Sequence, residues 1–127
     1  MIDRRLFVTG TLVAAAMPME VMAMNQDGAM HGLIGRLRAT PGQRDALIAI
    51  LLEGTAGMPG CLSYVVAKDA VEADAIWVTE VWDSRESHIA SLQLPAVRAA
   101  IERARPLIAG VEAGQRTIPV GGVGLPR

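Results

Sequence analysis

The chain has 127 residues, enough for one domain, and 51% of them are hydrophobic although only 3% are aromatic. The formal net charge is −1 and no cluster of lysine or arginine follows the N-terminus. We therefore expect no nucleic-acid binding, which requires a concentrated basic face. The core must be built from aliphatic side chains, and the single cysteine, Cys61, cannot form an internal disulfide.

The first 23 residues have the layout of an export signal. A charged start with Arg4 and Arg5 precedes an apolar run over residues 6–17, and Val21-Met22-Ala23 offers a cleavage site. The apolar run is shorter than the roughly 20 residues that span a bilayer. The arginine pair resembles the start of a twin-arginine export signal.

This signal predicts where the protein works. We expect a periplasmic or secreted bacterial protein, with no stable membrane insertion after signal removal, in which residues 24–30 form a linker. If translation starts instead at Met24 or Met30, the protein stays in the cytoplasm. The mass of the mature protein decides between the two.

Residues 31–120 are predicted to form one folded domain. Alternation of apolar and polar residues predicts strands, apolar residues at helical spacing predict helices, and glycine and proline mark the turns. Thr40 and Asp83 are the expected N-caps of the first two helices, each with Gln or Glu three residues later. The predicted elements are a strand at 31–38, a helix from 40 to about 54, strands at 61–67 and 75–82, helices at about 84–93 and 95–109, an edge strand at 111–120 that contains Gly114 and Pro119, and a flexible tail at 121–127.

The order of these elements predicts the fold class. The order strand, helix, strand, strand, helix, strand is that of an α+β fold with the ferredoxin-like split βαβ arrangement. In that fold the helices cover one face of an antiparallel sheet and the other face stays open. Because a large exposed apolar face is rare in a soluble monomer, we expect two sheets to pair face to face in a homodimer.

The segment from Ile76 to Pro95 resembles part of a known family. A strand ending in Glu80-Val81-Trp82, then a break and a helix that carries His88, is similar to the antibiotic biosynthesis monooxygenase domain, whose members include candidate quinol monooxygenases. The Thr40-Pro41-Gly42 helix start and the Pro59-Gly60-Cys61 turn fit the same pattern. The resemblance spans about residues 31–118.

The resemblance implies both a fold and an activity. The fold of the family is a dimeric α+β barrel made from two ferredoxin-like chains. Its catalytically characterised members include enzymes that oxidise quinols or polycyclic phenols with O2 and use neither a metal nor a flavin, so the resemblance implies no cofactor. The family often has a second histidine three residues after the one that matches His88, and this chain has Ser91 there.

Oxidation of a phenol without a cofactor gives the protein three tasks: to take the phenolic proton, to hold the anion and to exclude water. His88 suits the first task because imidazole titrates near neutrality, and Glu80 is a second candidate acid or base. Trp82 can stack on an aromatic substrate. Tyr64 can donate a hydrogen bond to the phenolate oxygen.

Arg36 and Arg38 are candidates for holding the phenolate through charge-assisted hydrogen bonds. Each candidate also has a purely structural interpretation: the arginines as solvated strand residues, and the histidine, the tryptophan, the tyrosine and the glutamate as packing or surface groups. His31, at the start of the domain, and Cys61, after a turn, are expected to be structural.

Two other functions remain alternatives. One is a binding protein of the same fold that shelters a small aromatic ligand without converting it. The other is haem degradation, for which His88 is the available axial ligand. No metal site is expected, because two histidines and one cysteine far apart in the chain lack the usual ligand spacing.

Overall fold

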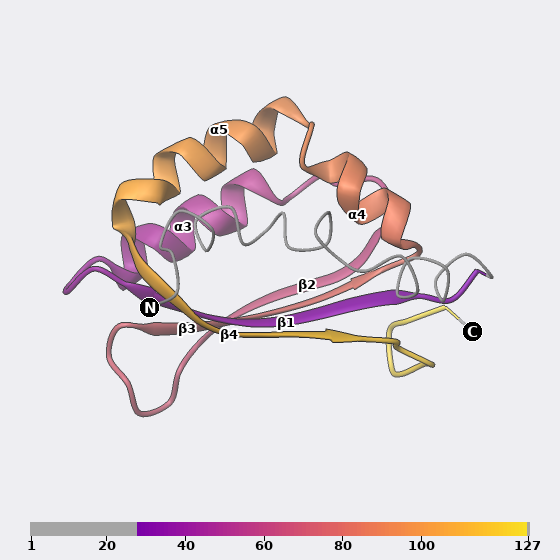
Figure 1. Ribbon diagram of the computed structural model, residues 1–127, viewed down its shortest axis with the longest axis horizontal. Coiled ribbons are helices and arrows are strands. Elements are labelled where there is room, and N and C mark those ends of the chain that lie inside the picture. The colour runs from indigo at the N-terminus through magenta and orange to yellow at the C-terminus, as the bar shows by residue number, and fades with distance from the viewer. Residues whose placement is uncertain (1–27, 127) are drawn as a thin grey trace.

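The computed structural model describes residues 28–126 and places a four-stranded sheet beneath three α-helices (Figure 1). The predicted export signal and most of the predicted linker lie outside the described residues. In chain order the elements are β1 (His31–Ala39), α3 (Arg44–Gly54), β2 (Cys61–Lys68), β3 (Ala75–Trp82), α4 (Arg85–Ser91), α5 (Pro95–Ala104), the 3-10 turn η2 (Arg105–Leu107) and β4 (Ile108–Thr117).

The strand order confirms the predicted α+β, ferredoxin-like fold. The strands lie in the order β2-β3-β1-β4, and every neighbouring pair is antiparallel. β4 is an edge strand, as predicted, but it ends at Thr117 and not at residue 120, so Pro119 lies beyond it. The register between β1 and β3 sets His31 opposite Trp82 and Leu33 opposite Glu80. The first residue of the domain and the last residue of β3 therefore meet at one end of the sheet.

The helices cover one face of the sheet and enclose an aliphatic core. Leu47 on α3 and Ile76 on β3 are fully buried, and Ala39, Val78 and Ala100 complete the centre of this core. Burial of such side chains is the main favourable term in folding, at about 25 cal/mol per Å² of apolar surface. Within residues 28–126, no helix lies on the opposite face of the sheet (Figure 1), which we call the helix-free face.

Two predicted helix starts are wrong in detail. α3 begins at Arg44, not at Thr40, and its N-cap Gln43 makes no side-chain cap bond. Residues 40–43 form a turn instead, in which the backbone N–H of Gln43 donates to the carbonyl of Thr40 at 2.9 Å. The cap of α4 is Ser84, not Asp83: its side chain accepts a hydrogen bond from the N–H of Ser87 at 3.1 Å.

The third helix ends five residues earlier than the apolar spacing predicted. α5 stops at Ala104, and Arg105–Leu107 form a single 3-10 turn that contains Pro106. Proline lacks the N–H that an α-helix interior needs, and its ring clashes with the carbonyl one turn earlier. Ile108 therefore belongs to β4, where it still packs against the core.

The C-terminal residues after β4 are largely exposed. Val120 and Val123 have almost no contact with the domain, and one backbone bond, from the N–H of Leu125 to the carbonyl of Gly122 at 3.1 Å, forms a turn. Within residues 28–126, no helix is both long enough and apolar enough to cross a membrane.

Candidate active site

The helix α4 is held in place by a tight junction with the turn before β2. The N–H of Asp83 donates to the carbonyl of Gly60 at 2.8 Å. Gly60 has φ +83°, and a Cβ on it would lie 2.4 Å from the Oγ of Ser87. Only glycine fits there without displacing α4. This junction sets the position of His88 above the end of β3.

The structure brings together three residues that the sequence proposed for the chemistry, namely Glu80, Trp82 and His88. The indole Nε1 of Trp82 donates to Oε1 of Glu80 at 2.9 Å, and the same oxygen lies 3.9 Å from Nε2 of His88. The imidazole of His88 lies 5.2 Å from the Trp82 ring, centroid to centroid. The expectation that His88 could be an exposed helix residue is wrong, because its side chain is only 3% exposed.

A second imidazole completes the cluster, and it comes from β1. His31 is fully buried and stacks on His88 with ring centroids 5.4 Å apart and an angle of 28° between the planes. The sequence predicts a structural role for His31, and Ser91 occupies the family's second histidine position. The β1–β3 pairing supplies the second ring instead. Three of the four ring nitrogens lack a hydrogen-bond partner in the part of the chain that the structure describes: Nδ1 and Nε2 of His31 and Nδ1 of His88.

Both imidazoles are held neutral near pH 7. Burial lowers the pKa of His31 to about 4, assisted by the positive charges of Arg116 and Arg85. Burial likewise lowers the pKa of His88 to about 4, with further contributions from His31 and Arg85. A neutral imidazole carries one lone pair and one N–H, so each ring can accept a proton or donate a hydrogen bond.

Burial shifts the pKa of the Glu80 carboxyl group in the opposite direction from that of the two imidazoles. Burial raises the pKa of its carboxyl group to about 7, although the hydrogen bond from Trp82 acts in the other direction. Near neutrality the group therefore exchanges a proton easily. Tyr64 lies opposite Glu80 on β2, and burial, followed by the nearby carboxylate, raises the pKa of its hydroxyl well above the usual value. Tyr64 thus stays protonated and can act only as a neutral hydrogen-bond group.

Trp82 does not form an open rim. Its side chain is 1% exposed and packs against Met58 and Val97 in a second hydrophobic cluster, with Cys61 and Tyr64 at the edge. The indole therefore lies between this apolar cluster and the polar cluster of Glu80 and the two imidazoles. Burial also raises the pKa of the partly buried Cys61 thiol, which disfavours the reactive thiolate.

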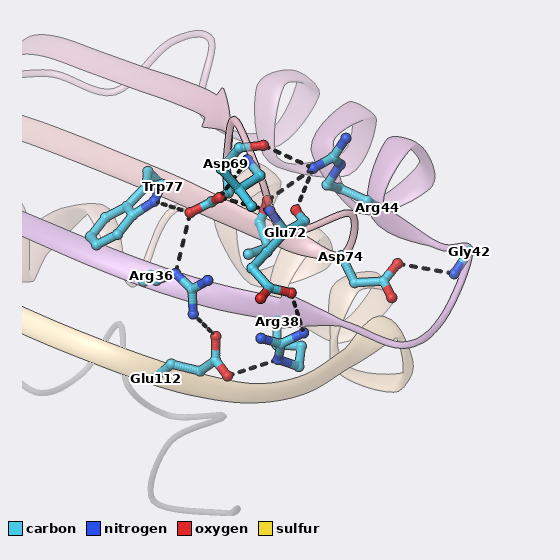
Figure 2. A network of polar contacts seen from close by, with 11 residues as sticks. Arg36, Arg38, Gly42, Arg44, Asp69, Glu72, Asp74, Trp77 and Glu112 are labelled. Carbon is cyan, nitrogen blue, oxygen red and sulfur yellow. Dashed lines mark hydrogen bonds and ion pairs between the residues drawn. The ribbon is translucent and has the colours of Figure 1, made fainter.

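Arg36 and Arg38 lie on the other face of the sheet from the imidazole cluster. Side chains of β1 point alternately to the two faces, and Leu37, between the arginines, packs into the core, so both arginines lie on the helix-free face. Both arginines pair with Glu112 of β4, and Arg36 also lies 3.5 Å from Asp69 (Figure 2). The structure does not bring them to the imidazole cluster, so their expected part in holding a phenolate there has no support from the geometry.

The residues on this open face are already paired with one another. The indole Nε1 of Trp77 donates to Oδ2 of Asp69 at 2.8 Å (Figure 2). The guanidinium of Arg36 lies 5.7 Å from the centre of the Trp77 ring, a distance typical of a cation–π contact. Arg44, the first residue of α3, donates to the carbonyl of Glu72 in the β2–β3 loop at 2.9 Å. In residues 28–126, no three His, Cys, Asp or Glu side chains are grouped so that they could hold a metal ion.

The sequence matches the family model for antibiotic biosynthesis monooxygenases over residues 30–103. The chain belongs to this family. The matched segment contains Glu80, Trp82 and both histidines of the cluster, and it ends before β4. The resemblance that the sequence carried is thereby confirmed.

Solved structures agree with the assignment to the antibiotic biosynthesis monooxygenase family. A candidate member from Chloroflexus aurantiacus is 65% identical, has a TM-score of 0.76, and aligns over 77% of this chain and 100% of that chain. A second candidate, from Caulobacter crescentus, is 21% identical with a TM-score of 0.67 over 74% of this chain and 92% of that chain, so it shows the fold alone. None of the curated proteins compared with the sequence matches it significantly.

Proposed function

We propose that the protein is a cofactor-independent monooxygenase that oxidises a quinol or a related phenolic small molecule with O2. The observation that carries the proposal is the pair of His88, whose side chain is 3% exposed, and Glu80, whose side chain is 14% exposed; among residues 28–126, Nδ1 of His88 has no hydrogen-bond partner. Membership of a monooxygenase family supports oxygen chemistry. The indole of Trp82 gives the cluster an aromatic wall.

His88 is the proposed general base. Its Nε2 faces the Glu80 carboxyl group, which favours the tautomer with the proton on Nε2 and leaves a lone pair on Nδ1. When Nδ1 takes the phenolic proton, the ring becomes a cation, and an ionised Glu80 stabilises it. Burial has removed water from His88 and most of it from Glu80, so this electrostatic stabilisation is stronger than it would be in solvent.

The proposed reaction needs no external reductant. The phenolic O–H bond breaks and an N–H bond forms at His88, and the phenolate then passes one electron to O2. The phenoxyl radical and superoxide combine into a C–O bond. Loss of the hydrogen on that carbon as a proton, with cleavage of the O–O bond, gives a new carbonyl group and releases the second oxygen atom as water. One quinol and one O2 thus give one hydroxyquinone and one water.

Oxygen uptake with a panel of hydroquinones tests the proposal. The purified, metal-free protein should consume O2 and quinol in equal amounts, because the quinol supplies all the electrons. A chelator should leave the rate unchanged. If no hydroquinone in the panel stimulates oxygen uptake above the rate of autoxidation, the proposed activity is wrong.

The alternative is a non-catalytic protein of the same fold that binds a small aromatic molecule. The burial of Trp82 favours it, because a closed site shelters a ligand better than it exchanges products. A compound that quenches Trp82 fluorescence in a Trp77→Phe background and is recovered unchanged would support this alternative. Haem degradation has less support, because His88 is buried and its Nε2 faces Glu80 rather than an open space.

We also propose that two copies pair through the helix-free face of the sheet. That face carries exposed apolar side chains, including Ile34 and Val65, next to the Trp77 and Arg36 group. The charged residues there are paired within the chain, so a partner sheet would not leave them as unpaired buried charges. The remaining apolar surface would then be removed from water.

The proposed dimer can be tested with two matched variants. Light scattering at micromolar concentration should give the mass of two chains, and Val65→Asp should reduce it to one, because the new charge would be buried in the interface. Leu52→Asp, on α3, is the control: Leu52 and Val65 are both 52% exposed, but only Val65 lies on the open face. A wild-type mass of one chain would contradict the proposal.

A further inference from the structure

His31 is a fully buried imidazole whose ring nitrogens the described residues do not satisfy. Neither Nδ1 nor Nε2 has a hydrogen-bond partner, although the side chain has no exposed surface. Buried polar groups in native proteins are nearly always hydrogen-bonded, because leaving them unpaired costs stability. A purely structural role would be served better by an apolar ring of the same size. The unpartnered nitrogens of His31 therefore point to a bound group that supplies the missing contacts.

The nitrogens without a partner belong to two neighbouring rings. His31 from β1 and His88 from α4 are stacked 5.4 Å apart, and Nδ1 of His88 is also without a partner. Apart from Nε2 of His88, which faces Glu80, every nitrogen of the pair is available. One oxygen atom placed at the edge of the stack could accept a hydrogen bond from each ring.

The charges around the pair favour an anion at that position. The guanidinium groups of Arg85 and Arg116 lie close enough to lower the pKa of His31, and Arg85 also lowers the pKa of His88. Arg85 is 3% exposed, so its charge is little screened by solvent. The titratable and charged groups that face the pair are Glu80 of β3, Arg85 and Glu86 of α4, and Arg116 of β4, with Tyr64 of β2 beyond Glu80.

We propose that His31 and His88 form an oxyanion site that binds a phenol in its ionised form. The phenolic O–H bond breaks, Nδ1 of His88 takes the proton and then donates it in a hydrogen bond to the phenolate, and His31 donates a second hydrogen bond. The two guanidinium groups offset the negative charge. His31 is thus a binding residue for the substrate oxygen, in the place that the sequence analysis gave to Arg36 and Arg38.

The proposal rests on the proposed function for where the phenol lies, but it does not depend on turnover. It also requires a local opening between α4 and the sheet, because both rings are buried. An electron-poor phenol separates binding from oxidation, because its ring resists the transfer of an electron to O2. Para-nitrophenol is such a probe, and its phenolate has a strong visible absorption band.

Titration of para-nitrophenol in the presence of excess protein tests the site directly. The pKa of the bound probe should fall by about one unit or more below its value in free solution, which is a tenfold preference for the anion. Para-nitroanisole, with the same ring and a methylated oxygen, should not displace the probe at equal concentration. A bound pKa that is unchanged or raised, or equal competition by the anisole, would overturn the proposal.

Two variants test whether His31 causes the fall in the pKa of the bound probe. His31→Phe keeps an aromatic ring in the stack and removes both nitrogens, so the pKa shift of the probe should be lost. Trp77→Phe, on the opposite face of the sheet, should keep the full shift. A folded His31→Phe protein that still ionises the probe would show that His31 does not bind the oxygen.

The two proposals fail in different ways. If para-nitrophenol is ionised and no hydroquinone is consumed, the oxyanion site stands and the monooxygenase activity is wrong. If hydroquinones are consumed while the bound nitrophenol shows no shift in pKa, the activity stands and the oxyanion site is wrong.

Discussion

Replacing His88 with alanine should lower the rate of quinol-dependent oxygen uptake by about 10²–10⁴-fold, the usual contribution of a general base. The substitution removes the nitrogen proposed to take the phenolic proton. The effect should appear in kcat as well as in KM, because His88 takes the phenolic proton and also donates a hydrogen bond to the bound phenolate. Steady-state oxygen uptake at several quinol concentrations gives both constants.

Ser91→Ala is the matched control for this variant. Ser91 lies one turn further along α4, is also buried, and its hydroxyl donates to the carbonyl of His88 at 2.6 Å. Its loss perturbs the same helix but keeps the imidazole, so most of the activity should remain. If His88→Ala retains wild-type kcat while folded, the proton must go elsewhere and the assigned base is wrong.

Glu80, Trp82 and His88 could be predicted as a cluster because they are close in sequence. A strand end and the helix after it place side chains near one another whatever the rest of the fold does, and the cap at Ser84 fixes the angle between them. The general position of the site was therefore available from one short segment. Its degree of burial was not, because that depends on how α5 and the turn at Met58 pack over the indole.

His31 could not be assigned in the same way. It is 57 residues before His88 in the numbering, and only the register of β1 against β3 brings the two together. A one-residue slip would turn His31 to the other face of the sheet. The arginines are a different case: alternation with Leu37 already placed Arg36 and Arg38 away from the core face that holds Glu80 and Trp82. That signal was present in the sequence and was sufficient to separate them from the site.

The free energy of unfolding should fall by about 1.4 kcal/mol per pH unit as the pH is lowered from about 6.5 to about 4.5. In the folded state the pKa of His31 and of His88 is about 4, below the usual 6.5, so each ring takes up a proton on unfolding in this range. Glu80, with its pKa raised from 4.5 to about 7, releases one. The net uptake of one proton by the unfolded chain makes acid destabilising, and urea unfolding at several pH values measures the slope.

Glu80→Gln should make this slope about twice as steep, because it removes the group that opposes the histidines. His31→Gln should flatten it, since one imidazole and Glu80 then compensate. Glu53→Gln, on the exposed surface of α3, is the control and should leave the slope unchanged. If the slope of Glu80→Gln equals that of the wild type, Glu80 is not protonated in the folded protein, and the neutral imidazole would then face a permanent carboxylate. In that case the negative charge of Glu80, which stabilises the protonated His88 during catalysis, would also raise the pKa of His88 in the resting enzyme. The two histidines should then contribute to the loss of stability in acid at different pH values.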